Sequence, residues 1–433
     1  MSQTGKIFVL AAGFLGWMFA GVQLGVTSLV MRVAAQGLMP DADEATLGQW
    51  FGWLVSALLL GGALGGYLFG WIGDRVGRKR AMALSILFYS VSAGLTYFVQ
   101  SPQQLLIMRF LTGIGVGGMW PNGVALISEA WPSISRPVLA GLMGTAANVG
   151  IMMASIVSYY YFVTPEDWRW TMLAGATPAV LSVFVLICVP ESPKWLAVRE
   201  KRQQAAQEST ASTSPLVEIF RQPLLGITLI GITLGTIPLF GGWGTANWAN
   251  AWASQIGDKT PPSSTDSANN SPDDPALKAR VLLARSGPGS LASLLGGVVA
   301  AAIGRKFSYF LLSLCSLASA QYIFWFSEPG ETSFLWGMAA LGLFSGFFFG
   351  WLPFCLPEMF PTRVRSTGAG VSFNFGRIVT VIGILVAAGL LKDQFQGDYA
   401  RIGRLTSWIY AFGMLAAFFI PPAAEEALAD ETQ

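Results

Sequence analysis

Two related decapeptides lie far apart in this chain: GWIGDRVGRK at residues 70–79 and GVVAAAIGRK at residues 297–306. Each stands between two long apolar runs, so each predicts a short basic loop that joins two membrane-spanning helices. The second copy keeps the Gly-Arg-Lys end but has alanines where the first has Asp74 and Arg75. The copies start at residues 70 and 297, an offset of 227, which indicates an internal repeat of about half the chain.

A second pair of segments supports the repeat. SEAWPSISRPVLAG begins at Ser128 and PEMFPTRVRSTGAG begins at Pro357. Their matching charged residues are Glu129 with Glu358 and Arg136 with Arg365. A parallel repeat of membrane helices is a transporter architecture, in which the substrate site lies between the two halves near the middle of the membrane.

The composition excludes several classes of protein. Of the 433 residues, 53% are hydrophobic and 12% are charged, against the roughly 25% charged that is typical of soluble domains. There is no histidine, the net charge is +2, and the three cysteines form no spaced cluster. The chain also has no Walker-type phosphate loop. We therefore expect a membrane protein that is not an enzyme, with no metal, no cofactor and no nucleic-acid partner.

The apolar runs predict an all-α membrane protein of twelve transmembrane helices in two pseudo-symmetric six-helix bundles. The expected domains are a bundle at 1–190, a cytoplasmic linker at 191–221 and a second bundle at 222–433. The expected spans are 8–31, 50–72, 81–99, 104–128, 138–162, 168–189, 222–246, 286–303, 307–326, 333–356, 367–391 and 405–421.

Lys and Arg set the expected orientation. They are more frequent in the segments that share a side with the 70–79 loop, which places both termini in the cytoplasm. This reading assigns Arg32, Lys278 and Arg285 to outer segments. The outer stretch at about 255–285 is rich in Pro, Ser, Asp and Asn, so we expect a mobile or partly ordered loop there.

Charged and polar residues inside spans are candidates for a substrate site because they are costly in lipid. Arg109 near the outer start of span four and Arg377 in span eleven, beside Asn374, are the strongest. The alternative for each arginine is snorkelling to the interface. Further candidates interrupt apolar helices, with packing or interfacial anchoring as the alternative: Gln23, Trp120, Asn122, Asn148, Asn247, Trp248 and Trp351.

Three segments together resemble the major facilitator superfamily over essentially the whole chain. GWIGDRVGRKR resembles the signature loop between spans two and three, and RFLTGIGVGG from Arg109 resembles the fourth-span motif. PESPKWL from Pro190 is similar to the end of span six in sugar-porter and organic-ion members. The resemblance implies alternating access around a cavity lined by spans one, four, seven and ten. Members of the family that carry organic anions have an arginine in span eleven, and Arg377 matches that position.

The resemblance further implies a cytoplasmic latch. Asp74 is expected to cap the start of span eleven and to pair with Arg78, while a network of ion pairs holds the two halves together. The alternative is that these charges only set topology. The expected latch residues are Asp74, Arg75, Arg78, Glu129, Arg136, Glu191, Arg305, Glu358 and Arg365.

The chain departs from related sialic-acid and aromatic-acid symporters. Their acids in span one align with Ala20 and Gln23, and their glutamate in span four aligns with Met119. With no acid inside a span, we expect uniport or exchange of a small organic anion, or a proton that travels with the substrate. The alternatives are a proton-coupled symporter for a sugar or neutral metabolite, and a transporter-derived ligand sensor. The expected partners are the small-molecule substrate and the lipid bilayer, and the expected state is a monomer.

Overall fold

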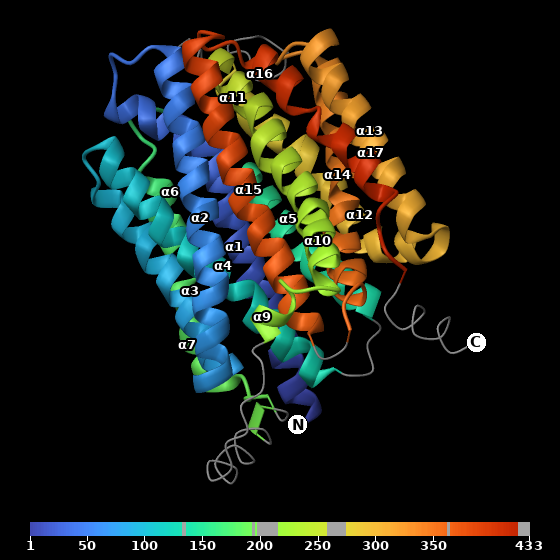
Figure 1. Cartoon of the computed structure of the whole chain (residues 1–433). Helices are drawn as coiled ribbons and strands as arrows, with labels where there is room; N and C mark the ends of the chain where they lie inside the picture. The colour runs from blue at the N-terminus through green and yellow to red at the C-terminus, as the bar shows by residue number, and fades with distance from the viewer. Residues whose placement is uncertain (132–135, 193–194, 197–214, 258–273, 362–363, 423–433) are drawn as a thin grey trace.

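The computed structural model describes residues 1–131, 136–192, 195–196, 215–257, 274–361 and 364–422. Its regular elements are helices that run roughly side by side in one bundle (Figure 1). Among these residues, eleven helices are long and apolar enough to cross a membrane. The prediction of an all-helical membrane fold is confirmed.

The first six predicted spans form what we call the N half. Span six is broken into two short helices by a turn at Thr177 and Pro178. The helices are α1 (Gln3–Leu38), α2 (Glu44–Val76), α3 (Arg78–Leu95), α4 (Pro102–Ala130), α5 (Arg136–Tyr160), α6 (Trp170–Ala176) and α7 (Ala179–Cys188).

The remaining spans form the C half, preceded by the single turn α9 (Pro215–Glu218). Span seven consists of α10 (Leu224–Phe240), a π-helical turn η2 (Gly241–Thr245) and α11 (Ala246–Gly257). Spans eight to twelve follow as α12 (Leu277–Ile303), α13 (Arg305–Phe326), α14 (Thr332–Glu358), α15 (Arg365–Asp393) and the pair α16 (Tyr399–Thr406) and α17 (Ile409–Ala417). The predicted domain boundaries at residues 190 and 222 stay a prediction.

The two ends of the bundle differ in chemistry. We call the end that carries the N-terminus and the turns at Gly77 and Gly304 the basic end. The opposite end, which carries the α1–α2 turn, α11 and α16, is the far end (Figure 1). Gly77 has φ +117° and Gly304 has φ +85°, so both copies of the repeat turn through backbone that favours glycine.

Glycine also sets how closely the helices pack. A Cβ built on Gly65 of α2 would lie 1.9 Å from the carbonyl oxygen of Ile114 in α4. A Cβ on Gly150 of α5 would lie 1.8 Å from the carbonyl oxygen of Met18 in α1. Small residues let membrane helices approach closely. Close helix packing therefore accounts for some of the fifty glycines in the chain.

The halves meet along two pairs of helices, α2 with α15 and α5 with α12. On the first seam, a Cβ on Gly52 would lie 2.6 Å from Cβ of Ala388. On the second, the hydroxyl of Thr145 donates a 3.0 Å hydrogen bond to the carbonyl of Ser290. We refer to these two contacts as the seams.

Two predicted boundaries at the far end are wrong, the end of span one and the start of span eight. Arg32 lies inside α1, and Lys278 and Arg285 lie inside α12. The error arises because hydropathy ends a span at its first charge, whereas these cations have partners in the fold. Arg32 pairs with Glu44, and Nζ of Lys278 donates to the carbonyl of Val163 at 2.8 Å. The mobile loop expected at 255–285 therefore shrinks, and residues 258–273 lie outside the described residues.

Candidate functional site

Arg377 lies twelve residues after the start of α15, near the middle of its span, and only 8% of it is exposed. Its Nη1 donates to the carbonyl of Gly62 in α2 at 3.0 Å and to Oδ1 of Asn374 at 3.4 Å. The guanidinium also sits 5.0 Å from the ring centroid of Phe373. This depth excludes snorkelling, and the described residues place no carboxylate within ion-pair distance of the cation.

Arg109 is buried completely, with 0% exposure. Its Nη1 lies 3.9 Å from Sδ of Met31, and neither Nε nor Nη2 has a hydrogen-bond partner among the described residues. Snorkelling is therefore excluded for this arginine as well. An isolated buried cation costs several kcal/mol, which makes this guanidinium a candidate for binding an anion.

Arg285 is a further arginine inside a span, and it was not predicted from the sequence. It lies in the third turn of α12, and Nη2 donates to the carbonyl of Gly242 at 3.3 Å. Gly242 belongs to the π-helical turn of span seven. The described residues give Arg285 no acidic partner. The apolar run Val281 to Leu283 before it was the available sign that the helix begins earlier.

The acids of the described residues lie elsewhere. Each stands in a loop, in the single turn α9, or in the first or last turn of a longer helix, as do Glu44, Asp74, Glu129 and Glu358. Within the described parts of the spans, the deeply placed charges are therefore cationic. This agrees with the expectation that no carboxylate faces Arg109 or Arg377.

Three predicted site residues are committed to packing within one half. The side-chain amide of Gln23 donates to the carbonyl of Gly175 at 2.8 Å, and that of Asn122 donates to the carbonyls of Phe69 and Gly118. Trp351 is fully buried, and its indole donates to Oγ of Ser308 at 3.0 Å. These donor groups are thus used inside one half, which favours packing over a place in the site, although Oδ1 of Asn122 has no partner among the described residues.

Three of the other four, Asn148, Asn247 and Trp248, contact the opposite half. Nδ2 of Asn148 donates to Oγ of Ser293 in α12 at 2.8 Å, and Oδ1 of Asn247 accepts a 2.8 Å bond from Ser28 of α1. Trp248 packs edge-on against Phe51 of α2, with ring centroids 5.8 Å apart. Trp120 instead packs against Trp17 inside the N half, at 4.9 Å.

The expected latch is not engaged at the basic end. Asp74 is 58% exposed and pairs with Arg78 of its own half at 2.6 Å. The N-cap residue of α15 is Val364, whose side chain makes no capping hydrogen bond. The expectation that Asp74 caps span eleven is therefore wrong for this conformation.

The other described latch residues make the following contacts within their own half. Glu191 accepts from the backbone N–H of Lys79 at 3.1 Å, and Ser192 donates to Glu129. In the C half, Arg305 pairs with Glu358. Arg75 lies 4.1 Å from the ring of Trp71, and Nε of Arg365 donates to the carbonyl of Phe360 at 3.3 Å. The side chain of Arg136 lies outside the described part of the structure.

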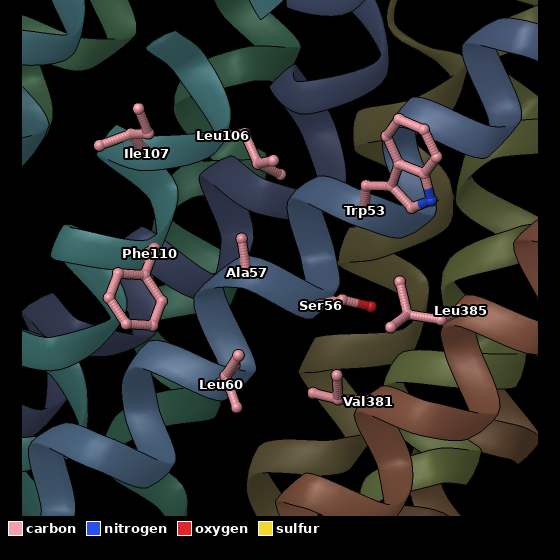
Figure 2. A pocket seen from close by; sticks show the side chains of 9 residues that line it. All are labelled: Trp53, Ser56, Ala57, Leu60, Leu106, Ile107, Phe110, Val381 and Leu385. Carbon is pink, nitrogen blue, oxygen red and sulfur yellow. The ribbon is translucent and has the colours of Figure 1, made fainter. Parts of the chain in front are cut away.

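An apolar groove of about 440 Å³ lies elsewhere, between α2 and α4 of the N half and α15 of the C half. Figure 2 shows that Trp53, Ser56 and Leu60 of α2 face Val381 and Leu385 of α15 across it. Leu60 and Leu385 are exposed. With no charged residue in its lining, this groove does not suit an anionic substrate.

Known transporters are similar to this chain in sequence. A family model described as "Sugar (and other) transporter" matches residues 8–219. A putative metabolite transport protein of Haemophilus influenzae is 30% identical over 380 residues, which cover 86% of each chain. A putative niacin/nicotinamide transporter of Bacillus subtilis is 27% identical and covers 88% of each chain. The cis,cis-muconate transport protein of Acinetobacter baylyi is 25% identical over 97% of this chain and 95% of its own.

A solved structure shares the fold. The crystal structure of a D-xylose–proton symporter superposes with a TM-score of 0.71 at 20% identity, covering 96% of this chain and 98% of its own. The protein is thus a transporter of the major facilitator superfamily. Within that superfamily the chain belongs to the sugar-transporter family, whose relatives move metabolites, and it is not an enzyme.

Proposed function

We propose that this protein carries a small organic anion across the membrane by alternating access. The observation that carries the proposal is Arg109, a fully buried guanidinium with two nitrogens that have no partner among the described residues. A carboxylate fits such a group because it accepts two parallel hydrogen bonds from one guanidinium.

Arg377 and Arg285 extend the argument. Both donate only to neutral oxygens in the described structure, so each keeps capacity for an anion. A buried charge that lacks a counterion is destabilising, and a substrate that brings negative charge relieves that cost. The proposed site therefore comprises Arg109, Arg377, Asn374 and Arg285, with Asn148 and Asn247 at its margin.

The coupling follows from the same charges. A proton-coupled carrier needs a group that gains and loses a proton during the cycle. The described spans place no acid beyond their terminal turns, and the chain has no histidine. We therefore propose uniport or exchange, or co-transport of a proton on the substrate itself.

One relative's name supports an anionic substrate, since cis,cis-muconate is a dicarboxylate. Another relative's name gives both niacin, a carboxylic acid, and its uncharged amide, nicotinamide. Another relative is described as an inner membrane protein. We propose the same membrane for this chain, with both termini in the cytoplasm as the excess of Lys and Arg indicates. We further propose that it works as a monomer and that the latch at the basic end engages when the far end opens.

The test is a thermal-shift screen of purified protein against carboxylic acids, each paired with its uncharged amide, for example nicotinate with nicotinamide. A ligand that binds the folded state raises the melting temperature. We expect acids to raise it and amides not to, and we expect Arg109→Ala and Arg377→Ala to abolish the effect. Sugars or amides that stabilise as well as acids, with no loss in either variant, would sink the proposal.

A further inference from the structure

A polar cluster joins the two halves at the far end. Arg32 of α1 is 4% exposed and pairs with Glu44, the first residue of α2, through Nη2 to Oε2 at 2.5 Å and Nε to Oε1 at 3.0 Å. Both residues belong to the N half. The two parallel bonds fix the carboxylate, so that one of its oxygens is presented toward the C half.

That oxygen is used by Tyr399 of α16. The phenol hydroxyl donates to Oε1 of Glu44 at 2.6 Å, and the tyrosine is almost fully buried. The ring of Tyr399 stacks on Trp248, with centroids 6.1 Å apart. Trp248 in turn contacts Phe51, so aromatic rings from both halves pack beside the hydrogen bond and exclude water from it.

The arginine makes a second bridge. Nη1 of Arg32 lies 3.4 Å from Oγ of Ser254 in α11. Nearby, Nζ of Lys392 in α15 donates to Oε1 of Gln49 in α2 at 3.1 Å. The far end is thus closed by several polar contacts between the halves, whereas the described ion pairs at the basic end stay within one half.

We propose that Arg32, Glu44 and Tyr399 form the gate that closes the far end of the transport pathway. The ion pair lies inside the N half, and the hydrogen bonds to Tyr399 and Ser254 cross between the halves. Opening breaks these hydrogen bonds while Arg32 and Glu44 stay together, and separating that buried pair would be far more costly. The contact is strong enough to seal and weak enough to open in each cycle.

The glycines of this region fit a gate that must close tightly. A Cβ on Gly48 of α2 would lie 2.5 Å from Cδ2 of Leu391 and 3.0 Å from the hydroxyl of Tyr399. At Gly397, which has φ +86°, a Cβ would lie 3.3 Å from Cβ and Cγ of Glu44. Bulkier residues at either position would hold Tyr399 away from the carboxylate.

The experiment measures how far the far end opens in the absence of substrate. Its outcome therefore does not depend on whether the substrate is an anion. The proposal rests on the alternating access of the proposed function. Spin labels go on Asp41 and Gln394, which are exposed at the far end on opposite halves, with Cys188, Cys315 and Cys355 changed to alanine. Pulsed electron–electron double resonance then measures the distribution of distances between the two labels across the gate.

We expect Tyr399→Phe to raise the population with a long far-end distance about tenfold, the effect of losing one hydrogen bond to a charged group. Glu44→Gln is expected to shift it in the same direction. The two changes should not add in the double variant, because both act on the same hydrogen bond between Tyr399 and residue 44.

The matched control is Tyr309→Phe. Tyr309 is as buried as Tyr399, but its hydroxyl donates at 2.7 Å to the carbonyl of Leu234 within the C half. This control should leave the far-end distance unchanged. If Tyr399→Phe gives the same distribution as Tyr309→Phe and the unchanged protein, the gate is disproved. If Glu44→Gln fails to fold, the gate is tested by comparing the far-end distance distributions of Tyr399→Phe and Tyr309→Phe.

Discussion

Arg377 in α15 donates a 3.0 Å hydrogen bond to the carbonyl of Gly62 in α2, so the cation proposed to bind substrate also bridges the two halves at mid-span. A substrate anion that binds this guanidinium competes with the carbonyl of Gly62. Binding and the relative position of the halves are then linked through one side chain, because a ligand shifts an equilibrium only by its differential affinity for the two states.

This bridge predicts that lysine cannot replace Arg377. Arg377→Lys keeps the charge but loses the planar fork that binds a carboxylate with two hydrogen bonds. We expect the affinity for the stabilising acid to fall at least about tenfold, measured by titration calorimetry. Arg401→Lys, an exposed residue that pairs with Asp398, is the control and should bind as the unchanged protein does. Equal affinity in both variants contradicts the role of Arg377.

Neighbouring glycines in α2 should tolerate alanine very differently. A Cβ on Gly61 would lie 2.1 Å from the carbonyl oxygen of Phe110, whereas the nearest atom to a Cβ on Gly62 is 3.5 Å away. Gly61→Ala should therefore destabilise the protein by about 1–3 kcal/mol through overpacking, and Gly62→Ala should change stability little. Thermal unfolding in detergent compares them, and equal melting temperatures would refute the packing of α2 on α4.

The two turn glycines offer a similar comparison. Both have positive φ, so alanine costs about 1–3 kcal/mol in backbone strain at each. At Gly77 a Cβ would also lie 2.2 Å from Oε2 of Glu191, while the space around Gly304 is open. We expect Gly77→Ala to lower the melting temperature more than Gly304→Ala. The reverse order would contradict the contact between Glu191 and the start of α3.

The latch is expected to act in the opposite sense to the far-end gate. Asp74 is 58% exposed and pairs with Arg78 of its own half while the far end is closed. The alternative conformation has the latch engaged and the far end open. Asp74→Asn should weaken that conformation and so favour the one seen here, with the far end closed. Spin labels on Val76 and Ile303, exposed at the basic end of each half, should report a smaller population with a short distance. An unchanged distribution would leave these charges as topology signals only.

Much of the fold could be predicted from the sequence because span length and the Gly-Arg-Lys repeat are local signals. The helices around residues 70–79 and 297–306 begin and end close to where the apolar runs change. The basic-end loops were also recognisable, since Gly77 and Gly304 turn as their repeat indicates. Hydropathy alone was enough for these elements.

The far-end gate could not be predicted in this way. Arg32 resembles a loop charge until Glu44 is placed beside it, and Tyr399 is 355 residues from Glu44 along the chain. Likewise, a polar residue inside a span predicts a binding site and a packing contact equally well. Only the position of the carbonyl of Gly175 shows that Gln23 is committed to packing.

Counterflow in proteoliposomes tests the central claim most directly. Vesicles loaded with the stabilising carboxylate take up its labelled form at equal pH on both sides. If buried arginines bind the anion and no protein carboxylate couples a proton, uptake proceeds without a pH gradient, persists in Glu129→Gln and is lost in Arg377→Ala. Uptake that requires a pH gradient and loses its coupling in Glu129→Gln, yet survives Arg377→Ala, would contradict the account.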